Sequence, residues 1–144
     1  MNSTRACCIC LIIISLACGC HAELVFFSDG RVYDSSMTMT EIISRFEGIE
    51  DPGTIILFHD KYCLACDDAL KIIKEVESEY PEVRIQYYDL FMNTTNKLLF
   101  EEYMAQYNQT GLHVPTAFIG PGGLEGALMI KTLFEPFSRL YFRI

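Results

Sequence analysis

The chain has 144 residues, of which 51% are hydrophobic and 12% aromatic, so it is long and apolar enough to fold as one domain around a core. This composition excludes a disordered chain. The formal net charge of −8 argues against nucleic acid as a partner, because phosphates repel an acidic surface.

Residues 1–22 are predicted to be a signal peptide or a membrane anchor. Arg5 supplies a positive charge, and residues 6–20 are almost wholly apolar, which is short for a membrane span but typical of a signal peptide. A small-x-small site at residues 20–22 would leave Glu23 as the mature N-terminus. An uncleaved anchor and lipid attachment at Cys18 or Cys20 are the alternatives. We expect an exported domain, residues 23–144, that is secreted or meets a membrane only through this segment.

Alternating strands and helices are predicted after residue 22. Short apolar or alternating runs between turn residues indicate strands, and apolar residues spaced by three or four indicate helices. The expected strands are residues 23–28, 54–58, 83–90, 114–119 and 124–129, and the expected helices begin near Thr38, Cys63, Asn96 and Ile130. Pro136 should kink the last helix or end its first part. The order β-α-β-α-β-α-β-β-α predicts an α/β fold, parallel in its alternating half, with an antiparallel hairpin near its end.

The first predicted helix has a clear start signal. Thr38 followed by Glu41 three residues later is a capping box, in which each residue bonds the backbone N–H of the other. The apolar residues Ile42, Ile43 and Phe46 are expected to face the core.

The motif Cys63-Leu64-Ala65-Cys66 carries the strongest chemical signal. It follows a predicted buried strand and starts a predicted helix, where free backbone N–H groups and the helix dipole favour a thiolate. Of seven cysteines, five lie within the first 20 residues, so only this pair remains in the body. A pair at this spacing closes almost no loop and stabilises a fold poorly, which favours a redox role over a permanent structural disulfide.

The two cysteines are expected to have different roles. Cys63 precedes the helix and should be the exposed nucleophile, whereas Cys66 lies in the first turn and should resolve the mixed disulfide. The carboxylates of Asp60, Asp67 and Asp68 disfavour a thiolate while the helix dipole favours it, so the net effect on reactivity stays open.

The element order, with CxxC at the start of the second helix, resembles the thioredoxin family. Residues 114–116 (Val-Pro-Thr) resemble the family's cis-proline motif, and residues 126–128 (Gly-Ala-Leu) match the stretch that leads into its last helix. The resemblance covers about residues 23–143. It implies a thioredoxin-like fold, with a mixed central sheet flanked by helices. It also implies an enzyme, a protein-disulfide oxidoreductase that acts on protein thiols and disulfides and is recharged by an unidentified redox partner, and we expect no cofactor.

The resemblance also implies a substrate-binding surface. Pro115 is expected to be cis and to lie beside the CxxC motif. It should expose the Val114 backbone, on which a substrate chain pairs as an added strand, with Tyr62 next to it. The chain departs from the family at three places: Leu64-Ala65 stands between the cysteines instead of Gly-Pro, Tyr62 stands in place of Trp, and the family's buried acid falls on Leu57.

Two other functions are alternatives. His59 and His113 are expected near the motif, and with the cysteines they would supply ligands for a copper- or zinc-handling metallochaperone. We prefer solvated or hydrogen-bonded histidines and predict no metal site. A non-catalytic interaction domain is the other alternative. An apolar collar for a partner protein would then consist of Tyr62, Leu64, Leu112, Val114 and Leu124, each of which is equally compatible with the core.

Overall fold

The structure, a computed structural model, describes residues 23–34 and 36–144. The predicted signal peptide or anchor at residues 1–22 lies outside this part of the chain. Among the described residues, no helix is long and apolar enough to cross a membrane.

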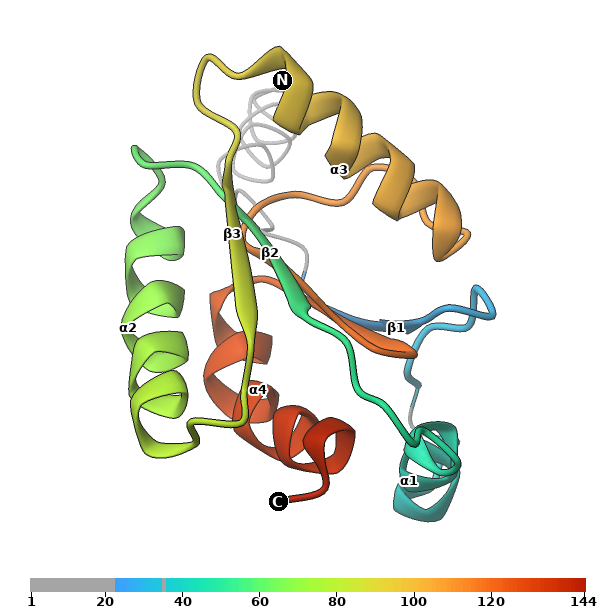
Figure 1. The fold of residues 1–144 in the computed structure, drawn as a ribbon. Coiled ribbons are helices and arrows are strands. Elements are labelled where there is room, and N and C mark those ends of the chain that lie inside the picture. The colour runs from blue at the N-terminus through green and yellow to red at the C-terminus, as the bar shows by residue number, and fades with distance from the viewer. Residues whose placement is uncertain (1–22, 35) are drawn as a thin grey trace, which may run out of the picture.

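The described chain forms an α/β fold in which a mixed five-stranded sheet is flanked by four helices (Figure 1). The strands are β1 (Leu24–Phe27), β2 (Ile55–His59), β3 (Ile85–Asp89), β4 (Thr116–Ile119) and β5 (Gly122–Glu125). The helices are α1 (Met39–Phe46), α2 (Leu64–Glu79), α3 (Thr94–Gln106) and α4 (Ala127–Phe142). The predicted order of elements is confirmed.

The sheet has the strand order β1-β5-β4-β2-β3. Strands β2 and β3 are parallel and are connected through α2, as the alternating half of the sequence predicts. Strands β4 and β5 form the predicted antiparallel hairpin. β4 also pairs antiparallel with β2, and β1 pairs antiparallel with β5 at the far edge. Strand β1 therefore runs opposite to β2 and β3, so the prediction of parallel strands in the alternating half is wrong for the first strand. β1 lies beside the hairpin strand β5, and this long-range pairing decides its direction.

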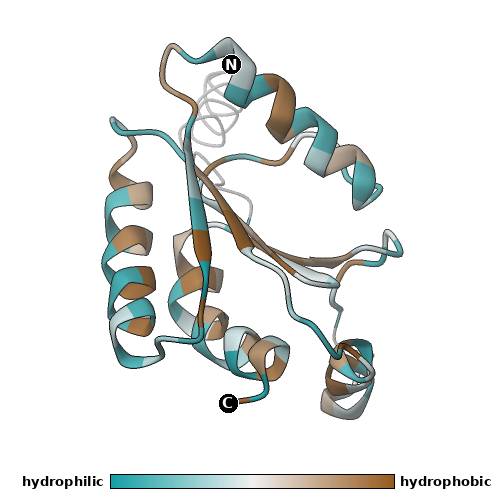
Figure 2. Ribbon diagram, viewed as in Figure 1, coloured by the Kyte–Doolittle hydropathy of each residue, from teal (hydrophilic) through white to brown (hydrophobic). Residues whose placement is uncertain are grey.

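Strand β2 is buried on both faces, because one core lies on each side of the sheet. Ile55 and Leu57 pack into the core under α1, α2 and α4, while Ile56 and Phe58 pack into the core under α3. This alternation follows from the two-residue period of a strand. Figure 2 shows the central strands as a hydrophobic band with mixed hydropathy on the helices around it.

Helix α1 begins with the predicted capping box. The Glu41 backbone N–H donates to the Thr38 hydroxyl (3.2 Å), and the Thr38 backbone N–H donates to the Glu41 carboxylate (2.7 Å). Ile42 and Phe46 are buried as predicted. The prediction for Ile43 is wrong, because its side chain is 40% exposed. One residue after Ile42 is about 100° further round the helix, which turns Ile43 toward solvent.

The last strand and helix begin earlier than the sequence predicts. Strand β5 starts at Gly122, although glycine is a poor strand former, because aromatic rings of the core pack over Gly122 and Gly123. Gly126 has a φ of 92°, a conformation that favours glycine, and α4 starts directly after it. The predicted strand 124–129 therefore covers the last two residues of β5, Gly126 and the first turn of α4.

Pro136 does not end the last helix. Helix α4 continues through it to Phe142, and the buried rings of Phe134 and Phe137 on either side anchor the helix to the core. A proline removes one backbone hydrogen bond, and this packing offsets that cost.

We expect Gly123→Ala to destabilise the protein. Gly123 pairs with Phe26 of β1, and a Cβ at this position would overlap the Phe26 ring. Overpacking of this kind costs about 1–3 kcal/mol, which urea denaturation of the reduced protein measures as a lower free energy of unfolding. In a Phe26→Leu background the same substitution should cost less, because the shorter side chain leaves room. Equal costs in both backgrounds would contradict this explanation.

Candidate functional site

The first cysteine of the motif caps helix α2. Cys63 has an extended backbone at the N-cap position, and its Sγ accepts a hydrogen bond from the Cys66 backbone N–H at 3.1 Å. The Cys63 backbone N–H donates to the Asp60 carbonyl at 3.1 Å, which closes the turn between β2 and α2. The sulfur therefore satisfies one of the free N–H groups at a helix start, where a negative charge is favoured.

The two cysteines differ in exposure as the sequence predicts. Cys63 is partly exposed, and Cys66 is fully buried. Burial, followed by the hydrogen bond with Cys63, raises the pKa of the Cys66 thiol to about 12. Both cysteines are free, and they are close neighbours, because the Cys63 Sγ accepts the Cys66 backbone N–H.

The loop before β4 faces the motif. The Val114–Pro115 peptide bond is cis, as predicted, and the Cys63 Sγ lies 3.9 Å from the Val114 carbonyl oxygen. Pro115 is buried and Val114 is half-buried. The structure thus brings Cys63, which directly follows Tyr62, to the loop that contains Val114 and Pro115.

Hydrogen bonds from the end of β5 and the start of β4 hold this loop in place. The Gly126 backbone N–H donates to the Pro115 carbonyl (2.9 Å), and the Thr116 hydroxyl donates to the His113 carbonyl. The Glu125 carboxylate accepts a hydrogen bond from the His113 backbone N–H (2.6 Å) and lies 3.2 Å from the His113 Nδ1. Glu125 is only 2% exposed.

Sequence reasoning missed Glu125. It lies in the otherwise apolar stretch 122–128, in which the sequence predicts a turn up to Gly123 and a strand from Leu124. A carboxylate on a strand that is expected to be buried is itself an unusual signal, because buried charges are rare unless they are paired. That signal would have identified this residue.

The turn that precedes Cys63 is held by two carboxylates. Asp60 accepts a hydrogen bond from the Tyr62 backbone N–H (2.9 Å), and Asp89 accepts from the backbone N–H groups of Phe91 (2.9 Å) and Lys61 (3.3 Å). The hydrogen bond from Phe91 is the main cause that lowers the pKa of Asp89. The two acidic residues after Cys66, Asp67 and Asp68, are exposed. Acidic residues therefore both precede and follow the CxxC motif in the chain.

Two of the five predicted collar residues do form an exposed surface. Tyr62 is 71% exposed and Leu64 is 83% exposed, with the Tyr62 ring edge-on to Phe91 at 4.5 Å. Leu112 and Leu124 are core residues, the other alternative, because they are buried in the two cores on opposite faces of the sheet. Both were ambiguous in the sequence, because an apolar residue near a strand end fits a core and a surface equally well.

The two histidines do not join the cysteines in a metal site. No group of three or more His, Cys, Asp or Glu side chains within residues 23–34 and 36–144 is arranged to hold a metal ion. The His113 ring lies against Glu125, and the His59 ring lies edge-on to Tyr87 with centroids 6.5 Å apart. The His59 Nδ1 is buried without a hydrogen-bond partner in this part of the chain.

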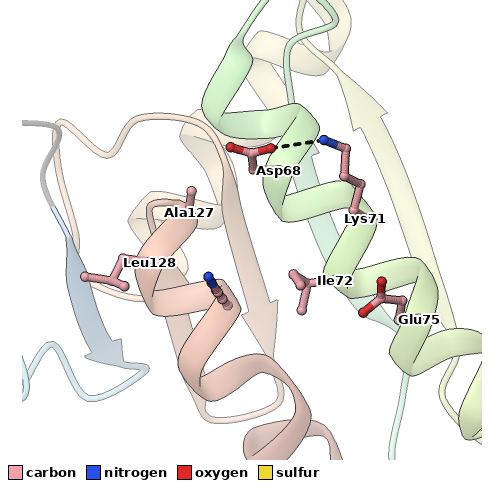
Figure 3. Close-up of a pocket in the computed structure, with 7 residues that line it drawn as sticks. Asp68, Lys71, Ile72, Glu75, Ala127 and Leu128 are labelled. Carbon is pink, nitrogen blue, oxygen red and sulfur yellow. Dashed lines mark hydrogen bonds and ion pairs between the residues drawn. The ribbon is translucent and has the colours of Figure 1, made fainter.

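Two cavities lie near the motif. One of about 390 Å³ lies between α2 and α4 and carries charges of both signs, including the Asp68–Lys71 ion pair at 3.1 Å (Figure 3). The other, of about 70 Å³, is lined by Glu23, Ala65, His113, Val114, Pro115, Glu125, Gly126 and Ala127. Of these two cavities, the smaller one includes the loop that faces Cys63.

No protein-family model, curated protein or solved structure matches this chain. The geometry of the site is therefore the basis for a functional proposal.

We expect Cys63 to react with iodoacetamide far faster than Cys66 in the reduced folded protein. Cys66 is buried and its pKa is about 12, so raising the pH from 7 to 10 should produce little Cys66 thiolate and little labelling. Peptide mass mapping after timed quenching measures both sites. In urea the two cysteines should label at similar rates, and faster labelling of Cys66 in the folded protein would contradict the assigned roles.

Proposed function

We propose that this protein is an extracytoplasmic thiol–disulfide oxidoreductase with a thioredoxin-like fold, which exchanges disulfides with protein substrates through Cys63 and Cys66. The observation that carries the proposal is the placement of the Cys63 sulfur. It caps α2, lies 3.1 Å from the Cys66 N–H, and is 3.9 Å from the Val114 carbonyl in the cis-proline loop. A partly exposed nucleophile beside a buried partner is the arrangement that exchange requires.

The reaction has two steps in the reducing direction. The Cys63 thiolate attacks one sulfur of a substrate disulfide, a Cys63–substrate bond forms, and the substrate's own S–S bond breaks to release a thiolate that takes a proton from water. Cys66 then loses its proton to a base, and its thiolate attacks the Cys63 sulfur. The Cys63–Cys66 bond forms, the Cys63–substrate bond breaks, and the second substrate sulfur leaves as a thiolate that takes a proton from water. Two electrons pass from the pair to the substrate, and the reverse sequence oxidises a substrate dithiol.

The second step requires a base, because the Cys66 thiol has a pKa of about 12. The position that carries a buried acid in the resembled family is Leu57 here, which lies in the apolar core and cannot accept a proton. Asp60 is the carboxylate whose negative charge contributes to the raised pKa of Cys66, and its side chain is held in the turn by the Tyr62 N–H.

The thioredoxin-like assignment rests on features that agree with the resemblance in the sequence. The element order, the parallel β2-α2-β3 unit, the β4–β5 hairpin and the cis bond before Pro115 all support it. Tyr62 and Leu64 give the motif an exposed apolar rim on which a substrate chain can pack.

We expect the two cysteine variants to behave differently. Cys66→Ser should accumulate mixed disulfides through Cys63, because the resolving thiol is missing. Cys63→Ser should exchange no disulfides, although serine preserves the helix cap. Non-reducing electrophoresis and mass spectrometry after incubation with a disulfide-bonded protein measure both results. Mixed disulfides through Cys66 in Cys63→Ser, at the rate of the other variant, would refute the proposed mechanism.

The extracytoplasmic location rests on the sequence of residues 1–22. Intact-mass analysis of the native protein should give a chain that starts at Glu23 if the segment is cleaved. An added acyl mass on Cys18 or Cys20 would identify a lipid anchor, and a full-length chain in the membrane fraction would identify an uncleaved anchor. A full-length chain in the cytosol would contradict export.

A further inference from the structure

We propose that the 70 Å³ cavity beside the motif binds the cationic side chain of a lysine or arginine that neighbours the attacked cysteine in the substrate. This inference rests on the proposed function, since it assigns a substrate class to the same site. The argument starts from the buried carboxylate of Glu125.

The Glu125 carboxylate lacks a permanent cationic partner. In the part of the chain that the structure describes, both of its close contacts, the His113 N–H and the His113 Nδ1, meet the Oε1 atom. Its one ion-pair partner there is the His113 ring, which is 74% exposed and charged only when protonated. A buried carboxylate is stable as an ion only when a cation or several donors compensate it, and Oε2 retains acceptor capacity for another donor.

The cavity lies where a substrate chain would pass. Val114 and Pro115 form part of its wall, and the Val114 carbonyl lies 3.9 Å from the Cys63 Sγ. Ala65, between the two cysteines, forms another part of the wall. An extended substrate chain paired with the Val114 backbone would present side chains on alternate sides, so that a residue adjacent to the attacked cysteine faces the loop.

A second carboxylate lines the same cavity. Glu23 accepts hydrogen bonds from the Leu128 and Met129 backbone N–H groups, at 3.4 and 3.0 Å, at the start of α4. The positive end of this helix would repel a cation, and the charge of Glu23 offsets it. The cavity is thereby left with the Glu125 carboxyl group, whose one ion-pair partner among the described residues is the exposed His113 ring.

The size of the cavity suits the end of a basic side chain. A volume of about 70 Å³ is several times the roughly 10–15 Å³ that is needed to hold one water molecule. That space admits an ammonium or guanidinium group, while the aliphatic stem of the side chain lies against Val114 and Ala65.

The test is a rate comparison with short peptides that carry a disulfide to a chromophoric thiol and differ only in the residue next to the cysteine. That residue is Lys, Arg, Gln or Glu, and the chromophore released by reduced wild-type protein gives the rate. Lysine and arginine peptides should react roughly tenfold faster than the glutamine peptide, which is within the range for a charge-assisted hydrogen bond, and the glutamate peptide should be the slowest.

The variant Glu125→Gln separates the effect of the negative charge from the support that the side chain gives to the loop. The amide oxygen of glutamine can still accept the His113 N–H, so the loop keeps its support while the negative charge is lost. The preference for basic peptides over the glutamine peptide should fall to within about twofold. Glu101→Gln, the same change of net charge on the exposed surface of α3, should keep the full preference. If Glu125→Gln does not fold, Glu23→Gln is the second variant and should lower the preference at least twofold.

The outcomes separate the two proposals. Equal rates for all peptides with the wild-type protein, or a preference that survives both cavity substitutions, overturns the cation site and leaves the exchange chemistry intact. A preference lost equally in Glu101→Gln indicates a general effect of net charge and also overturns it. A protein that releases no chromophore from any peptide refutes the proposed function and this inference together.

Discussion

The antiparallel pairing of β2 with β4 is the constraint on which the site depends. Phe58 near the end of β2 pairs with Thr116 at the start of β4. Because the two strands run in opposite directions, the C-terminal end of β2 lies beside the N-terminal end of β4. The chain that leaves β2 and the chain that enters β4 therefore meet at the same end of the strands. Cys63 and Val114, 51 residues apart, are therefore neighbours.

The β4–β5 hairpin also helps to position the loop before β4. Glu125 pairs with Thr116 across β4 and β5, so the carboxylate lies beneath the loop that leads into β4. Hydrogen bonds from His113 and from Gly126 then tie the loop to this strand. The motif is held from the other side, where α2 packs Ala69, Ile73 and Val76 into the core. Helix α2 and the β4–β5 hairpin thus set the spacing between Cys63 and the loop.

Local signals predicted much of the fold. The apolar run of β2, the capping box of α1 and the CxxC helix start each depend on residues within a few positions of one another, so the sequence displays them directly. The strand order depends on long-range pairing, and nothing local indicates that β1 joins β5. The start of β5 was misplaced because neighbouring rings, from distant parts of the chain, make Gly122 and Gly123 suitable for a strand.

The candidate site was predictable to the same extent. CxxC and the proline motif identified Cys63, Cys66 and Pro115, because both are short patterns with a chemical reason. The burial of Leu112 and Leu124 is decided by which helices cover each face, and the role of Glu125 is decided by its cross-strand partner. Such properties arise only when the sheet is assembled.

The capping role of Cys63 has a consequence for the helix itself. The sulfur that would bond to a substrate also accepts the Cys66 N–H and closes the first turn of α2. A sulfur that has entered a disulfide is neutral and is a weaker acceptor than a thiolate, so the order of this turn varies with the chemical state of the cysteine. In the proposed exchange reaction, the start of α2 would thereby differ between the reduced and the oxidised protein, in the backbone as well as in the side chains.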